Sequence, residues 1–214
     1  MARRIMIVGN GEIPRGAADF IDLSDVVIRF NDCRSVGPGG NRTDIVAVCN
    51  TGRPGKAMTE SADWRNNDSV QQASAIWSVR DPAKFSDMEP EILKNWPELA
   101  DFCADYSTGF AAFAEETGKA HIVIPRAVHE RVDAALQAYL PEPYVCPSSG
   151  MVAIAHVLEE SRTSDDEVAI VGFGHEGWSL HPFAAERQLV DALTREGRLI
   201  RISDTSIFSA SEGA

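Results

Sequence analysis

The sequence lacks a long apolar run, an excess of basic residues and any cysteine spacing typical of a metal or disulfide site. No stretch approaches the roughly 20 apolar residues that a helix needs to span a bilayer. The apolar run near the N-terminus ends at Gly9-Asn10-Gly11, which is too early for the hydrophobic core of a signal peptide. We therefore expect a first core strand there and no membrane span.

Charge and cysteine usage exclude further classes of protein. The net charge is -12, whereas nucleic acids and anionic membranes are generally bound by basic surfaces. An anionic substrate would therefore need a local set of hydrogen-bond donors. The four cysteines show no Cys-x-x-Cys spacing and no pairing with histidines, so we expect no zinc site or disulfide framework, and a reduced cytoplasmic location.

What the sequence does contain is an alternation of strand and helix patterns. This alternation predicts an α/β fold, a single doubly wound Rossmann-like domain with a mostly parallel sheet. We expect one domain over residues 1–208 and a frayed tail over 209–214. The expected strands are 4–8, 26–28, 45–49, 75–77, 122–124, 168–171 and 199–202. The expected helices are 17–21, 90–103, 109–117, 127–140, 149–161 and 183–196, with loops over 33–43 and 51–72.

The first candidate for a binding site is the glycine-rich turn after the first strand. Gly9 and Gly11 resemble the start of a dinucleotide fingerprint, but Pro14 stands where the third glycine belongs, so a tight turn explains them equally well. Asn10 lies at the carboxyl end of the strand, the edge where open parallel sheets bind ligands. Its amide suits a base or a phosphodiester; the alternative is a left-handed asparagine that supports the turn.

The end of the second strand adds polar residues to the same edge. Asn31 follows that strand, so we expect it to converge with Asn10 on one crevice. Asp32 would be placed to bind a ribose hydroxyl. Arg29 lies on the same side of the strand as Asn31. Because a buried guanidinium needs a partner, we expect Arg29 to pair with Asp44 or a nearby carboxylate.

A second half of the site is predicted where residues 147–150, Pro-Ser-Ser-Gly, open a helix. A serine at a helix start is an ordinary N-cap. A helix N-terminus also offers free N–H groups and the positive end of its dipole to an anion. The two interpretations are compatible, because one of Ser148 and Ser149 can cap the helix while the other binds a phosphate or carboxylate, with Gly150 allowing close approach.

Two histidines follow in the last part of the chain. His181 precedes Pro182, and because proline favours the first helical position, His181 is a candidate N-cap. The helix dipole would keep its ring neutral, the form that a general base requires; the alternative is a surface cap without chemistry. Glu186 could turn back as an orienting or capping group. His175 follows Gly172-Phe173-Gly174 at a strand end, where acid–base or phosphate chemistry is favoured over metal binding.

The four segments described above, in their order along the chain, resemble the sialyltransferase type of glycosyltransferase, whose members share large, small and very small sialyl motifs. Residues 7–32 resemble the large motif, residues 147–174 the small motif, and His181 with Glu186 the very small motif. The chain also resembles bacterial proteins labelled as urease-operon accessory proteins. That label describes a gene neighbourhood rather than a chemistry.

The resemblance implies a metal-independent, inverting transfer of a sugar acid from a CMP-activated donor to an acceptor hydroxyl, with no further cofactor. It implies that His181 is the general base and that His175 is the nearest candidate for a histidine that assists the leaving phosphate. The nucleotide- and donor-binding residues then expected are Gly9, Asn10, Gly11, Asn31, Asp32, Ser148, Ser149 and Gly150. The catalytic residues expected are His181, His175 and Glu186, with no metal ligand.

The chain also departs from that family. It lacks the cysteine pair that joins the large and small motifs of the lumenal members, and it is shorter where acceptors bind. The donor sugar therefore stays open between sialic acid, Kdo and another acid sugar, and the acceptor between a glycan and a small molecule. One alternative is a catalytically reduced, nucleotide-binding accessory protein. Another is an NAD-type Rossmann enzyme, which Pro14 and the serine-rich helix start disfavour.

Overall fold

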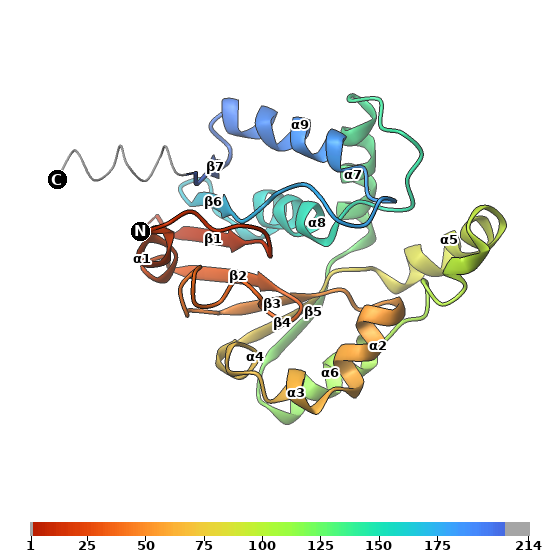
Figure 1. Ribbon diagram of the computed structural model, residues 1–214, viewed down its shortest axis with the longest axis horizontal. Coiled ribbons are helices and arrows are strands. Elements are labelled where there is room, and N and C mark those ends of the chain that lie inside the picture. Colours follow the sequence, from red (N-terminus) through yellow and green to blue (C-terminus); the bar gives the residue numbers. More distant parts are fainter. Residues whose placement is uncertain (1, 204–214) are drawn as a thin grey trace.

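The computed structural model describes residues 2–203, so the tail expected over 209–214 lies outside the described residues. Helices flank a seven-stranded parallel sheet (Figure 1). The strands are β1 (Arg4–Val8), β2 (Val26–Phe30), β3 (Ile45–Val48), β4 (Ala75–Ser78), β5 (Ala120–Val123), β6 (Glu167–Val171) and β7 (Ile200–Arg201). The helices are α1 (Ala17–Asp22), α2 (Gly52–Glu60), α3 (Ala62–Arg65), α4 (Asp68–Gln72), α5 (Pro82–Asn95), α6 (Ser107–Glu116), α7 (Arg126–Gln137), α8 (Ser149–His156) and α9 (Phe183–Arg195), with short helical turns η1 (Pro97–Leu99) and η2 (Val157–Ser161).

The order of the strands places a ligand crevice beside β1. Across the sheet the order is β5-β4-β3-β2-β1-β6-β7, so the chain builds outward from β1 and then returns to lay β6 against its other side. Open parallel sheets bind ligands at the carboxyl ends of the strands where the winding direction reverses. In this sheet that point lies between β1 and β6, where Gly9 and Gly172 directly follow the two strands.

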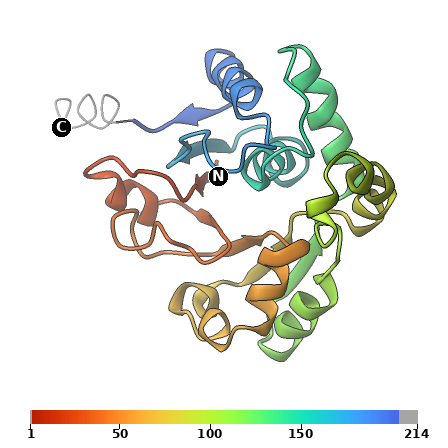
Figure 2. The ribbon, with the colours of Figure 1, turned by 45° about the vertical axis from the view of Figure 1, so that its right-hand side comes forward.

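Both faces of the sheet are covered, which confirms the predicted doubly wound α/β fold. Along β1, Ile5 and Ile7 pack in one cluster with residues of α7, α8 and α9. Met6 and Val8 point to the opposite face and pack with α1. Figures 1 and 2 show α7, α8 and α9 together on one side of the sheet, and α2, α3, α4 and α6 on the other. Within residues 2–203, no helix is both long and apolar enough to cross a membrane.

The expected loop over 51–72 is wrong, because three short helices occupy it. The signals of α3 and α4 are caps rather than a periodic apolar face, whereas α2 has no side-chain cap hydrogen bond and contains Gly52, Pro54 and Gly55, residue types typical of a loop. The Ser61 hydroxyl accepts the backbone N–H of Trp64, and the Asn67 side chain accepts that of Ser69. Each of these helices buries one large apolar side chain, Met58, Trp64 or Val70, so the sequence of this region is mostly polar. The expected helix over 90–103 is also misplaced: α5 starts at Pro82, behind an Asp81 cap, and runs through Pro90.

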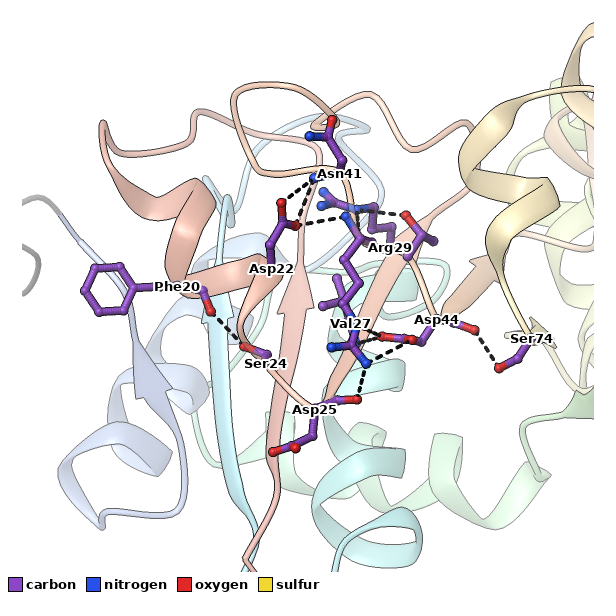
Figure 3. A network of polar contacts seen from close by, with 11 residues as sticks. Phe20, Asp22, Ser24, Asp25, Val27, Arg29, Asn41, Asp44 and Ser74 are labelled. Carbon is purple, nitrogen blue, oxygen red and sulfur yellow. Dashed lines mark hydrogen bonds and ion pairs between the residues drawn. The ribbon is translucent and has the colours of Figure 1, made fainter.

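The expected ion pair of Arg29 is wrong as well. The buried guanidinium donates to the Arg42 carbonyl (Nε to O, 3.0 Å), the Gly39 carbonyl (Nη2 to O, 2.6 Å) and the Ser35 hydroxyl (Nη1 to Oγ, 3.0 Å). Asp44 instead pairs with Arg42 at 2.8 Å (Figure 3). The loop after β2 wraps Arg29 in neutral oxygens, so this arginine has a structural role.

Candidate functional site

A cavity of about 440 Å³ opens at the carboxyl ends of β1, β2 and β6. The turns after these strands form one side, and the start of α8 and the segment leading into α9 form the other. Every residue predicted for the site lines this cavity except Asp32. The lining residues from that prediction are Gly9, Asn10, Gly11, Asn31, Ser148, Ser149, Gly150, His175, His181 and Glu186.

The glycines of this cavity are required by close packing. A Cβ on Gly9 would lie 2.2 Å from the carbonyl oxygen of Gly172, and one on Gly11 would lie 2.8 Å from the same atom. The Gly11 N–H donates to that oxygen at 2.9 Å. A Cβ on Gly150 would lie 2.6 Å from the Phe173 ring. Glycine therefore lets the turns after β1 and β6 touch and lets α8 approach them, which forms the floor of the cavity.

The two asparagines present different groups to the cavity. Asn10 donates from Nδ2 to the Phe30 carbonyl at 3.3 Å, while its Oδ1 is buried without a hydrogen-bond partner among the described residues. Asn31, not Asn10, takes the left-handed conformation, and its Oδ1 accepts the Cys49 N–H at 2.9 Å. A buried acceptor without a partner is unfavourable unless a ligand reaches it. Asn10 thus offers an acceptor, and Asn31 retains its NH₂ group.

Ser148 and Ser149 divide the two roles expected of the helix start. The Ser148 hydroxyl accepts the Met151 N–H (3.2 Å) and donates to Glu186 Oε2 (2.6 Å), and the Ser148 backbone N–H donates to Glu186 Oε1 (2.6 Å). Burial raises the pKa of Glu186 above its usual range. Glu186 thus ties α9 to the start of α8. The Ser149 hydroxyl has no hydrogen bond within residues 2–203 and lines the cavity.

His181 is not the N-cap of α9, because Pro182 occupies that position. Its Nδ1 lies 2.8 Å from the carbonyl oxygen of Cys146. Since a carbonyl only accepts, Nδ1 carries the proton and Nε2 holds the lone pair. Burial lowers the pKa of His181 to about 4, and the charge of Arg80 acts in the same direction. The ring is therefore neutral, as expected, but burial rather than the helix dipole is the cause.

His175 shares this cavity in an unusual conformation. Its φ angle is 52°, and its Nε2 is buried without a partner among the described residues. Burial lowers the pKa of His175 to about 4, and the charges of Arg201 and Arg187 add to that effect. A neutral ring with an unused Nε2 can exchange a hydrogen bond with a ligand group in the cavity.

Asp32 lies outside the cavity. Its carboxylate pairs with Arg34 at 3.1 Å and is half exposed. It borders a separate hollow beside Met58 and Trp64. The chain turns at Asn31, which has a φ of 52°, so the next side chain leaves the edge shared by Asn10 and Asn31. The structure therefore does not bring Asp32 to the position expected for a ribose ligand.

A second cavity, of about 520 Å³, adjoins the first and was missed by sequence reasoning. The two cavities share Asn31, Arg34, Ser149 and His181. Arg80, directly after the strand residues of β4 and Val79, lines the second one. Its place at the carboxyl end of a strand is the signal that pointed to Asn10, and the same rule applied to β4 would have found it.

Comparison with solved structures defines the class of fold. A mammalian sialyltransferase superposes with a TM-score of 0.54 at 19% identity, covering 94% of this chain and 69% of that one. An alpha-2,3/8-sialyltransferase mutant gives a TM-score of 0.49 at 14% identity, covering 93% and 81%. The first likeness shows the fold alone. The chain thus has a Rossmann-like fold of the sialyltransferase type.

The sequence comparison gives the family. No family model matches the sequence. The chain is 50% identical over 212 residues to the urease operon 23 kDa accessory protein of Rhizobium meliloti (strain 1021), covering 99% of this chain and 98% of that protein. The chain belongs to the family of that accessory protein. Both resemblances expected from the motifs are therefore confirmed, one at the level of fold and one at the level of family.

Proposed function

We propose that this protein is a glycosyltransferase that moves a sugar acid from a CMP-activated donor to an acceptor hydroxyl. The observation that carries the proposal is the state of His181. Its Nδ1 proton is held by the Cys146 carbonyl, its ring is neutral, and its Nε2 is left to accept a proton where two cavities meet. A general base needs this combination of tautomer, protonation state and access.

The first cavity supplies groups suited to a cytidine monophosphate. The unpaired Oδ1 of Asn10 accepts a hydrogen bond from the nucleoside, and the NH₂ group of Asn31 donates one. The N–H groups at the start of α8, together with Ser149, bind the phosphate. This arrangement needs no basic side chain, which suits a chain with a net charge of -12.

The transfer then follows from the positions of the two histidines. The acceptor oxygen attacks the anomeric carbon of the donor, and its proton passes to Nε2 of His181. The bond between that carbon and the phosphate oxygen breaks, and its electron pair leaves with CMP. His175 donates a hydrogen bond from Nε2 to the departing phosphate. Attack and departure on opposite sides of the carbon invert its configuration, and the proposal requires no metal ion.

The test is CMP release from CMP-sialic acid and CMP-Kdo, measured chromatographically with a panel of glycan and small-molecule acceptors. We expect His181→Ala to lower turnover by about 10²–10⁴-fold, the usual contribution of a general base, while CMP affinity stays within about twofold. His121→Ala serves as the control, since His121 lies on β5 and lines neither cavity. Equal turnover in His181→Ala and the control would remove His181 from the mechanism.

A second candidate function is a nucleotide-binding accessory protein without transferase activity. The observation that favours it is the relationship to a urease operon accessory protein at 50% identity. CMP binding without donor turnover, across the whole acceptor panel, would support this candidate over the first.

A further inference from the structure

The second cavity has a buried positive charge that no carboxylate in the described part of the chain neutralises. Arg80 is 6% exposed, and Asn50 fixes its backbone through bonds of 2.7 and 2.8 Å to the N–H and carbonyl groups. Its Nη1 donates to Thr51 Oγ1 at 2.6 Å, and the guanidinium lies 4.5 Å from the centre of the Phe102 ring. No ion pair within residues 2–203 includes Arg80.

Comparison with Arg29 shows why this matters. Both arginines are buried and lack a carboxylate partner among the described residues, but four oxygen atoms surround Arg29. Arg80 donates to a single oxygen and, weakly, to the Cys146 thiol at 3.8 Å. A buried charge with unused donors is unfavourable unless an anion reaches it. Since Arg80 lines the cavity, an anion can reach it there.

The remaining lining residues add positive charge and an aromatic wall. Arg34 and Arg53 line the cavity in exposed ion pairs, Arg34 with Asp32 at 3.1 Å and Arg53 with Asp101 at 2.8 Å, and Asp101 is the one acidic side chain among its lining residues in the described part of the chain. Phe102, which lies against the Arg80 guanidinium, stacks with Trp178, with ring centres 5.3 Å apart. The cavity therefore combines a buried arginine that has no carboxylate partner within residues 2–203 with an adjoining aromatic surface, in a chain of net charge -12.

We propose that the second cavity binds the acceptor, and that the acceptor is a small molecule carrying a phosphate or carboxylate beside a ring or other apolar part. The anionic group lies on Arg80 and on Arg53, which exchanges its exposed ion pair with Asp101 for the ligand anion, and the apolar part lies against Trp178. The identification as an acceptor rests on the proposed transferase function, because it uses His181, which lines both cavities. The binding of an organic anion does not depend on that function.

The test uses phenyl phosphate as the probe and benzyl alcohol as its neutral counterpart, titrated calorimetrically into the full chain. We expect phenyl phosphate to bind at least roughly tenfold more tightly than benzyl alcohol, because its anion gains charge-assisted hydrogen bonds. Arg53→Gln should weaken phenyl phosphate by roughly tenfold. Arg80→Lys should weaken it by roughly fivefold or more, since lysine keeps the charge but loses the planar fork of donors.

Arg126→Gln is the matched control, because Arg126 is an exposed, ion-paired arginine that lines neither cavity. Arg53 is also exposed, so its variant tests the proposal even if Arg80→Lys fails to fold. Equal binding of the two probes, or equal affinities of Arg53→Gln and Arg126→Gln, would overturn the proposal.

Competition separates this proposal from the transferase function. We expect phenyl phosphate and CMP to bind together. If CMP displaces phenyl phosphate, phenyl phosphate binds in the first cavity. If CMP-sialic acid displaces it but CMP does not, Arg80 binds the carboxylate of the donor. Either result contradicts an acceptor site. If the protein binds phenyl phosphate through these arginines but does not bind CMP, the result would support the anion site and reject the transferase function.

Discussion

The chemistry proposed for this protein depends on which nitrogen of His181 carries the proton. The Cys146 carbonyl fixes the proton on Nδ1, and burial keeps the ring neutral. From the sequence, the neutral state was expected from a helix dipole acting on an N-cap. Proline at 182 was expected at the first helical position, but it takes the cap itself. The ring is neutral because His181 is buried, not because of a helix dipole. Burial depends on tertiary packing, which the periodicity of the sequence does not reveal.

The burial of His181 predicts an unusual pH profile for turnover. Because the pKa of His181 is lowered from 6.5 to about 4, the ring stays unprotonated and able to accept a proton throughout the range between those values. We expect kcat/KM to stay level from about pH 8 to about pH 5 and to fall only as the pH approaches 4. A descending limb centred near 6.5, measured in the free-enzyme profile, would contradict the buried, neutral base.

Sequence reasoning placed residues next to strand ends correctly in space, but not a residue beyond a turn of the backbone. Asn10, Asn31 and His175 share one cavity, as expected, because each follows an apolar strand and the carboxyl ends of parallel strands share one edge. Asp32 lies outside that cavity because the chain turns at Asn31 in a left-handed conformation that the sequence does not reveal. Arg80 meets the same strand-end rule but lies in the middle of the chain, where the strand pattern was weak.

Among the elements of the fold, the turns after β1 and β6 are in direct backbone contact at Gly9, Gly11 and Gly172. We expect Gly9→Ala to destabilise the protein by about 1–3 kcal/mol, because overpacking against rigid backbone forces the turns apart, and to weaken CMP binding. Thermal unfolding and CMP titration measure both effects. The control is Gly109→Ala on α6, where the crowding atom belongs to the movable Thr59 side chain. A Gly9→Ala protein as stable as the control would show that the turns do not touch.

The start of α8 separates a structural serine from a binding serine. Ser148→Ala removes the N-cap and one hydrogen bond to the buried Glu186, so we expect a loss of about 1–2 kcal/mol in the free energy of unfolding. Ser149→Ala should leave that free energy within about 0.5 kcal/mol and weaken CMP by roughly fivefold. Chemical denaturation and CMP titration of the two variants measure these effects. Reversed effects of the two substitutions would contradict the division of roles.

The elements themselves were predictable to the extent that their residues repeat a pattern. Each of the seven strands was expected within a few residues, because buried parallel strands are continuous apolar runs. The helices α3 and α4 were missed because they are short, polar and defined by the caps Ser61 and Asn67. The helix α2 was missed because Gly52, Pro54 and Gly55 are residue types typical of a loop. These helices pack on the far face of the sheet, but the first residues of α2, Gly52, Arg53 and Pro54, line the second cavity, so that cavity was missed together with the helix.

In the molecule as a whole, an acidic chain gathers the groups proposed to bind anions at one edge of the sheet. These groups are a helix start and neutral amides in the first cavity, and arginines in the second. Both meet at His181. The membership in the urease operon accessory family says nothing of this chemistry, and the fold of a sialyltransferase gives only its framework. The pocket itself therefore has to be tested with its own ligand.

Calorimetric titration of CMP into the wild-type chain and into Asn10→Ala is the sharpest test of the proposed cytidine site. We expect saturable binding of CMP at or below about 1 mM, tighter than that of UMP, AMP or GMP, and weakened roughly fivefold by Asn10→Ala because one hydrogen bond is lost. Asn66→Ala, an exposed asparagine outside both cavities, should match the wild type. No heat of binding at that concentration, or identical curves for the wild type and Asn10→Ala, would contradict the proposal that this cavity holds a cytidine nucleotide.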